Sequence, residues 1–398
     1  MKSSREKTSP PGAYQSNGWK DHAVTRLDNG LVELTVIADG GHLADFRFSE
    51  SSGASSRNVL WESPWLHQAP SERRIEDLAK TAGFTGHALC LDRFGEPSAR
   101  EVENGLTLHG EAATKRWVAT PSMNLDEAAC RWNVHLPIAH VEFERTIRLG
   151  NGESVAFIEE TVTNQRGSDH ECDWVQHATF GPPFLHAEES VFAASGVNGL
   201  TATGGYGDDS LLVNDRHFIW PYAPLRPPQN GMTDLRQPFA NRGKGIIAAV
   251  LLDPRRRVEY ILAVNRKWRL GMGYCFRRED FPWMMVWEEN CTRADRPWNG
   301  ATQARGMEFG TAPFPAGRED TLRRGPLFDT PSSCVIPGGG AKTARYVMFL
   351  FRLPDGVDSV QSAEVNKDAI DIHGEGPEQT FSIPAVGVGR FLSRDSEG

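Results

Sequence analysis

Three stretches of this 398-residue chain each bring one titratable side chain to a strand end or a turn. They are Leu106–Glu111 with His109, Trp174–Leu185 with His177, and Ala304–Thr311 with Glu308. A histidine titrates at about 6.5, and partial burial raises the pKa of a carboxyl group toward neutrality, so such side chains could supply both an acid and a base at cellular pH. The residue types therefore favour proton transfer.

Each of these side chains also has a simpler interpretation. A lone histidine in an apolar run, such as His177, is more often satisfied in a core than catalytic. Glu308 stands between apolar residues with glycines at 306 and 310, so its carboxylate either lies near a cleft or is paired in the core. The run that carries His177 stops at Gly181–Pro183. Because proline lacks a backbone N–H, a paired strand ends there, and His177 is well placed to face a cleft.

A metal site is the main chemical alternative. Residues two apart on a strand point to the same face, so His109 and Glu111 could share a metal ion with His177. Otherwise the chain contains no GxSxG, HExxH, P-loop or EF-hand motif. The acidic and histidine residues at 169–173 follow a turn-like stretch, and we interpret them as a solvated hairpin loop.

The elements that must position these side chains are mainly β-strands, because apolar residues alternate with polar ones between Gly, Pro and Asn residues. Strands are expected over residues 31–37, 42–48, 105–109, 132–138, 141–149, 154–163, 245–252, 257–264, 268–276, 281–287, 306–310 and 344–353. One helix is expected over Pro70–Gly83, with Ser71 as its N-cap. Residues 195–245 are rich in Gly, Pro and Asn and are expected to form long loops, which could act as a lid.

This pattern predicts an all-β protein in which two large, mainly antiparallel sheets pack as a sandwich. No linker divides the chain, so we expect one domain over residues 21–392, with flexible tails at 1–20 and 393–398.

Charge and cysteine content restrict the function further. A formal net charge of -9 makes a nucleic acid or an anionic membrane an unfavourable partner. The six cysteines are scattered through a long chain without a CxxC pair, which is typical of reduced thiols in a cytoplasmic protein. We expect neither a signal peptide nor a membrane span, because no apolar run is long enough.

The order of several short motifs resembles the aldose 1-epimerase, or galactose mutarotase-like, superfamily. The matching motifs, in chain order over roughly residues 25 to 355, are Gly40-Gly41, Leu108-His109-Gly110, Thr161-Val162-Thr163-Asn164, the His177 strand, Gly306-Met307-Glu308 and Ile336-Pro337-Gly338. The resemblance implies a β-supersandwich and an isomerase that interconverts the anomers of a sugar without a cofactor.

The same resemblance implies roles for individual residues. Glu308 would act as the base on the anomeric hydroxyl, His177 as the acid at the ring oxygen, and His109 as a helper that binds and polarises the sugar. Arg93 would correspond to a substrate-binding arginine; the alternative is an ion pair of Arg93 with Asp92 or Glu96.

Two other functions stay open at this point. The first is a non-catalytic carbohydrate-binding module on the same fold. The second is a metal-dependent sugar isomerase or lyase with His109, Glu111 and His177 as ligands. All three interpretations take a small sugar or sugar derivative as the ligand, and the oligomeric state is left open.

Overall fold

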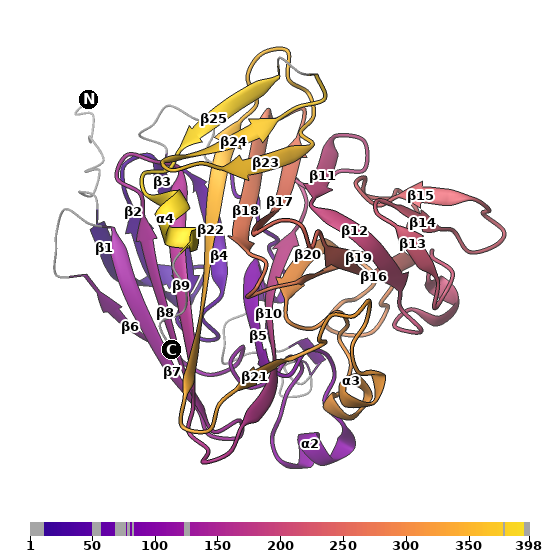
Figure 1. The fold of residues 1–398 in the computed structure, drawn as a ribbon, viewed down its shortest axis with the longest axis horizontal. Coiled ribbons are helices and arrows are strands. Elements are labelled where there is room, and N and C mark those ends of the chain that lie inside the picture. Colours follow the sequence, from indigo (N-terminus) through magenta and orange to yellow (C-terminus); the bar gives the residue numbers. More distant parts are fainter. Residues whose placement is uncertain are drawn as a thin grey trace.

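The computed structural model describes residues 12–49, 57–67, 77, 80, 81, 83–122, 128–376 and 379–393. Two large antiparallel sheets dominate these residues, and a small third sheet lies at the C-terminal end (Figure 1). Among the described residues, no helix is long and apolar enough to cross a membrane. The prediction of an all-β sandwich is confirmed.

The first sheet has 14 strands. In spatial order they are β1 (Gly12–Trp19), β2 (His22–Asp28), β3 (Val32–Ile37), β4 (Leu43–Phe48), β5 (His87–Asp92), β10 (His170–Phe180), β20 (Gln303–Gly310), β19 (Trp283–Asn290), β16 (Lys244–Leu252), β12 (Gly196–Thr201), β13 (His217–Ile219), β14 (Tyr222–Pro224) and β15 (Met232–Asp234), with β21 (Cys334–Ile336) paired to β10. The second sheet has eight strands: β11 (Ser190–Ala194), β17 (Val258–Asn265), β18 (Leu270–Arg277), β22 (Ala341–Arg352), β9 (Val155–Asn164), β8 (Val141–Leu149), β7 (Ala129–Leu136) and β6 (Val118–Pro121).

The main core fills the space between these two sheets. Strand β8 shows the pattern that builds it: every second side chain, from Val141 to Leu149, is buried. Across the interface, the rings of Phe276 in β18 and Phe309 in β20 stack with centroids 4.3 Å apart. Burying one such ring contributes roughly 1.5–3 kcal/mol to the free energy of folding. The apolar side chains at every second position therefore stabilise the packing of the two sheets.

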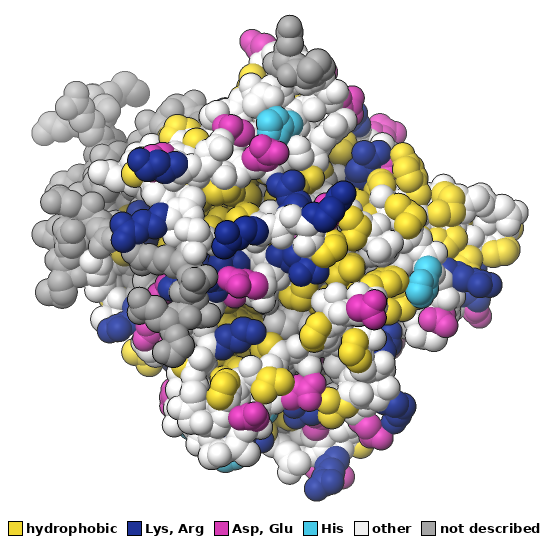
Figure 2. Space-filling model, viewed as in Figure 1, with side chains coloured by type: hydrophobic (Ala, Val, Ile, Leu, Met, Phe, Trp, Pro, Cys, Tyr) yellow, Lys and Arg dark blue, Asp and Glu magenta, His cyan; other side chains and the backbone are white. Residues whose placement is uncertain are grey.

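The outer faces of the two sheets differ. The outer face of the eight-stranded sheet packs against β23 (Ser362–Val365), β24 (Ala369–His373), β25 (Thr380–Pro384) and α4 (Val388–Ser393), which lie together in Figure 1. On the outer face of the 14-stranded sheet, an aromatic cluster that includes Trp61, Trp65, Phe84, Trp287 and Trp298 forms a separate small core. Farther along this sheet, Figure 2 shows hydrophobic side chains at the surface around β13–β15, where Ile219, Tyr222 and Met232 are exposed.

Several local predictions need correction. Residues 12–19 of the expected N-terminal tail form β1, because their backbone pairs with β2. Residues 169–173, expected as a solvated loop, include the start of β10, and His170, Cys172 and Asp173 are buried there. Residues 105–109 form a turn rather than a strand.

Other differences concern loops and the chain end. Residues 195–245 contain the short strands β12–β15 as well as loops. The C-terminal sheet β23–β25 has no counterpart in the predicted strands. Of the helix predicted over residues 70–83, Asp77, Lys80 and Thr81 are helical, whereas residues 70–76, 78, 79 and 82 lie outside the described residues.

Candidate active site

Strands β10 and β20 place His177 and Glu308 directly across from each other. The two strands are antiparallel neighbours, and Thr179 pairs with Gly306. Two residues farther along the ladder, the same register sets His177 opposite Glu308. Because strand side chains alternate between faces, both point to the outer face of the 14-stranded sheet.

The Glu308 carboxyl group is buried without a hydrogen bond. The residue is 1% exposed, and neither carboxyl oxygen has a hydrogen-bond partner within the described part of the chain. Its Oε1 atom lies 3.2 Å from Nε2 of His177. Burial raises the pKa of Glu308 well above its usual 4.5, because desolvation disfavours the charged form of the carboxyl group.

Gly306 leaves the space that the Glu308 carboxyl group occupies. The two residues are on the same face of β20, and a Cβ atom at position 306 would lie 2.4 Å from Oε1 of Glu308. Any larger side chain there would displace the carboxyl group. A glycine two residues before Glu308 is therefore needed to leave room for the carboxyl group.

His177 is a neutral imidazole in this setting. Burial lowers its pKa to about 3. Its Nδ1 atom lies 2.8 Å from the Thr179 hydroxyl, which itself lies 3.3 Å from the backbone carbonyl of His177. Both contacts are satisfied when the hydroxyl donates to the carbonyl and accepts from Nδ1–H. Nε2 then carries a lone pair toward Glu308, and burial of the two groups favours the uncharged form of each.

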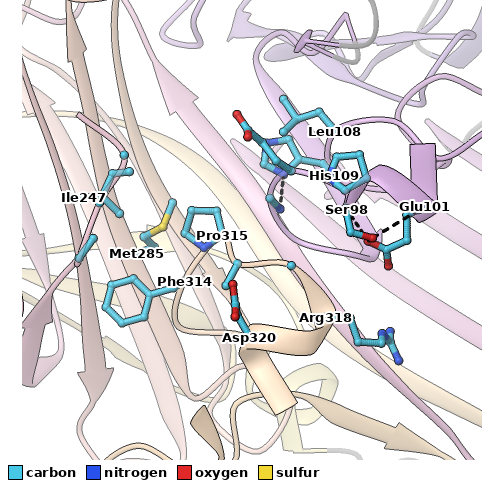
Figure 3. Close-up of a pocket in the computed structure, with 18 of the residues that line it drawn as sticks. Ser98, Glu101, Leu108, His109, Ile247, Met285, Phe314, Pro315, Arg318 and Asp320 are labelled. Carbon is cyan, nitrogen blue, oxygen red and sulfur yellow. Dashed lines mark hydrogen bonds between the residues drawn. The ribbon is translucent and has the colours of Figure 1, made fainter. Parts of the chain in front are cut away.

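The tautomer of His109 follows from its backbone contact. The Gly95 N–H donates to Nδ1 of His109 at 3.1 Å, which Figure 3 shows as a dashed line. A backbone N–H can only donate, so Nδ1 is an acceptor and the neutral ring carries its hydrogen on Nε2. Burial lowers the pKa of His109 well below 6.5, and the nearby His177 and Arg293 lower it further. His109 is therefore a neutral hydrogen-bond donor.

All three predicted side chains line one cavity of about 1010 Å³. The ring centroids of His109 and His177 are 5.3 Å apart, and that of Phe84 lies 4.8 Å from His177. Figure 3 shows Leu108 and His109 on one side of this cavity and Met285 with other apolar residues on the other. A cavity of this size, lined by apolar side chains on one part of its wall and by charged and polar side chains on another, can hold a small molecule.

Apart from Leu108, which precedes His109, most other residues of the cavity come from segments that were not singled out as candidate sites in the sequence. Its apolar wall includes Phe84, Leu108, Ile247, Met285, Trp287 and Phe314, and its polar wall includes Ser98, Arg100, Glu101, Arg293, Arg318 and Asp320. Most lie in loops or in the short helices α2 (Ala99–Glu103) and α3 (Arg318–Arg324). Loop residues carry no periodic signal, so the sequence could not indicate them.

Arg93 is held by two acidic side chains beside the site. Its guanidinium donates to Asp92 at 2.7 Å and to Glu101 at 2.6 Å, and it is not among the residues that line the cavity. The ion pair with Asp92 was the alternative to substrate binding, whereas Glu96 is not a partner of Arg93 here. The substrate-binding role of Arg93 stays a prediction.

Asp92 joins several parts of that wall. Its carboxylate accepts hydrogen bonds from His170 at 2.6 Å and from Arg318 at 3.2 Å, in addition to Arg93. Burial opposes the charge of Asp92, but the hydrogen bond from His170 and the two arginines together lower its pKa. Asp92 thereby stays ionised and fixes α3 beside the end of β5.

Glu111 does not join His109 and His177. Its Oε2 atom accepts the backbone N–H groups of Ile138 at 2.7 Å and Ala139 at 3.1 Å, and the residue is not part of the cavity lining. His109 lies in a turn with a φ of 64°, so the strand alternation on which the three-ligand prediction rested does not apply. Across the described residues, no group of three or more His, Cys, Asp or Glu side chains is arranged to hold a metal ion.

Comparisons with known proteins place the fold. Neither a protein-family model nor a curated protein matches the chain. Solved structures do match. A galactose mutarotase-like protein from Clostridium acetobutylicum is 12% identical with a TM-score of 0.59, over 86% of this chain and 99% of the other. A candidate aldose 1-epimerase from Klebsiella pneumoniae is 15% identical with a TM-score of 0.58, over 85% and 83%.

A galactose mutarotase related enzyme from Lactobacillus acidophilus gives a TM-score of 0.52 at 12% identity, over 83% of this chain and 98% of the other. At such low identity the likeness concerns the fold. The chain has the galactose mutarotase-like fold in a divergent form, and the resemblance seen in the sequence is confirmed at that level.

Proposed function

We propose that this chain is an aldose 1-epimerase-like mutarotase that interconverts the anomers of a sugar by general acid and base catalysis at Glu308 and His177. One observation carries the proposal: a buried carboxyl group without a hydrogen bond faces a neutral imidazole at the wall of a cavity of about 1010 Å³. A buried polar group without a partner is costly, so it is retained where a ligand completes it.

The proton count of this pair suits the reaction. Opening a cyclic hemiacetal removes a proton from the anomeric hydroxyl and delivers one to the ring oxygen, and closing the ring reverses both transfers. The carboxylate of Glu308 with a protonated His177 is the form that opens the ring, with the carboxylate as base and the imidazolium as acid. The neutral pair is the form that opening leaves behind. The charged and the neutral form of the pair differ only in whether one proton is on His177 or on Glu308.

His109 would bind the sugar as a neutral donor. Its Nε2–H group is fixed by the Gly95 contact, and its ring lies beside that of His177. Because it is uncharged, it can polarise a sugar oxygen without competing for the proton that Glu308 and His177 exchange. The proposed reaction is complete with these side chains and needs no cofactor.

The decisive experiment follows anomer exchange by NMR magnetisation transfer across a panel of aldoses. We expect the protein to accelerate exchange for at least one sugar and the Glu308→Gln variant to lose this acceleration. Glu142→Gln, which makes the same chemical change at an exposed position on β8, is the matched control and should keep it. If no sugar responds, the proposal fails. Sugar binding by the natural protein and by Glu308→Gln, with no accelerated exchange in either, would select a non-catalytic binding protein instead.

A further inference from the structure

Two buried cysteines lie against each other in the core between the two sheets, on the face of β10 opposite to that of His177. Cys172 in β10 and Cys334 in β21 are directly opposite in the antiparallel ladder, and their sulfur atoms are 3.4 Å apart. Both thiols are free and buried. This close pair has no part in the proposed proton transfer, although Cys172 is five residues before His177 on the same strand.

The backbone around the two cysteines fits a disulfide. Opposite residues of an antiparallel pair have Cα atoms roughly 4.5–5.5 Å apart, and a disulfide spans about 4.4–6.8 Å between Cα atoms. The sulfur atoms already touch, so forming the bond needs only a small movement along the line that joins them. The two strands can therefore stay paired in the oxidised protein.

Strand β21 offers a route by which an oxidant reaches the pair. It has three residues and, within the described part of the chain, β10 is its one paired neighbour. Val335, between Cys334 and Ile336, is 54% exposed. A short edge strand opens locally at low cost, which exposes Cys334 while β10 stays in the sheet.

We propose that Cys172 and Cys334 form an oxidation site that closes to an intramolecular disulfide on reaction with a peroxide. The Cys334 thiolate attacks one peroxide oxygen, the O–O bond breaks, and a sulfenic acid and one water are produced. The Cys172 sulfur then displaces the sulfenic oxygen as a second water, and the S–S bond forms. The two thiols lose two electrons in total, and hydrogen peroxide accepts both. The hydrogen bond with Cys172 lowers the pKa of Cys334, which favours Cys334 as the attacking sulfur.

The bond would tie the cavity wall to the strand that holds His177. The segment between β20 and β21 carries α3, whose Arg318 lines the cavity and contacts Asp92. After α3 the chain continues through residues 325–333 into β21. Oxidation would fix the end of this segment to β10 and restrict the movement of that wall. The proposal concerns the two thiols alone and does not depend on the reaction at Glu308.

The test is thiol mapping of the folded protein. We would treat it with hydrogen peroxide, quench, denature, alkylate, and map peptides without reduction. We expect one pair of peptides joined through Cys172 and Cys334 and the loss of two alkylatable thiols. In Cys172→Ser the link should disappear and Cys334 should proceed to sulfinic acid. Cys275→Ser, which removes a different buried thiol, is the control and should keep the link.

Two outcomes would overturn the proposal. One is that Cys172 and Cys334 both stay fully alkylatable at a peroxide dose that oxidises Cys291, the thiol of intermediate exposure. The other is that Cys334 is recovered mainly in a link to a cysteine other than Cys172. Because the readout is covalent, it gives a clear answer even if no sugar substrate is found.

Discussion

Two glutamates of this protein are equally buried but differ in every contact. Glu160 in β9 is 0% exposed and Glu308 in β20 is 1% exposed. The Glu160 carboxylate points between the sheets, where four side chains donate to it: Arg145 at 2.7 Å, Trp174 at 3.0 Å, Gln176 at 2.6 Å and Tyr346 at 3.0 Å. Glu308 points to the opposite face of the 14-stranded sheet and has no hydrogen bond among the described residues.

The comparison separates a buried carboxylate that is part of the core from a buried carboxyl group that faces a cavity. Glu160 is balanced by a guanidinium and three neutral donors, so its charge belongs to the core that joins the two sheets. The Glu308 carboxyl group is also removed from water, but among the described residues no hydrogen-bond donor compensates for this. It lines the cavity instead. In the sequence both are glutamates in strand patterns, and the contacts alone separate their roles.

The largest expected effect is on activity and comes from the partner of Glu308. His177→Asn should lower accelerated anomer exchange by about 100-fold to 10,000-fold, because the acid of the pair is lost. His135→Asn, at an exposed histidine that contacts Glu142, is the matched control and should be unaffected. Exchange rates measured by NMR on equal amounts of folded protein check this. Near-normal exchange in His177→Asn would remove His177 from the mechanism.

The next effect is on stability and comes from the other glutamate. Glu160→Gln should lower the free energy of unfolding by about 3–5 kcal/mol, because the buried Arg145 guanidinium loses its countercharge. Denaturant unfolding measures the loss, and activity per folded molecule should stay unchanged. A destabilisation below about 1 kcal/mol would mean that the neutral donors alone satisfy this site.

A smaller effect on activity is expected at the glycine beside Glu308. Gly306→Ala places a Cβ atom where the Glu308 carboxyl group lies, and displacing a catalytic group by about 1 Å costs on the order of 10-fold to 100-fold in kcat. Gly18→Ala is the control, since a Cβ atom on that strand residue meets no atom within 4 Å. Kinetic comparison of the two variants tests whether the space at Gly306 matters.

The smallest effect per pH unit is a pH dependence of stability. The pKa of Glu308 is raised in the folded protein, whereas in the unfolded chain it stays near 4.5. Its contribution to stability is therefore complete below pH 4.5 and is lost as the pH rises through the folded pKa. The stability of Glu308→Gln relative to the natural protein should rise with pH above 4.5, by at most about 1.4 kcal/mol per pH unit.

Unfolding curves at pH 5 and pH 8 measure this difference. A relative stability that stays flat between the two pH values would mean that Glu308 is already ionised in the folded state. Glu142→Gln again serves as the comparison, because its carboxyl group is exposed.

Much of the fold could be predicted from the sequence, because packing against the sandwich core places apolar side chains at every second residue of strands such as β8 and β18. Strand β1 was missed because its residues, with two glycines and several polar side chains, show no such pattern and pair mainly through the backbone. The start of β10 was missed for another reason: its polar residues His170 and Asp173 are buried, since they bind Asp92 and the Phe94 N–H.

The site was accessible only in part. His109, His177 and Glu308 stood out by type and position, and the cavity contains all three. Their proximity was not derivable, because β10 and β20 are far apart in the sequence and meet only in the assembled sheet. The distinction between Glu308 and Glu160 could not be predicted either, because it depends on donors from β8, β10 and β22 that only the fold brings together.

The most direct test of the central claim compares anomer exchange in Glu308→Gln and Glu160→Gln, each corrected for the folded fraction, with a sugar that the natural protein accelerates. We predict that Glu308→Gln folds normally and has lost the acceleration, while Glu160→Gln is less stable but fully active when folded. Full activity in Glu308→Gln, or a loss of activity confined to Glu160→Gln, would contradict the assignment of Glu308 as the catalytic carboxyl group.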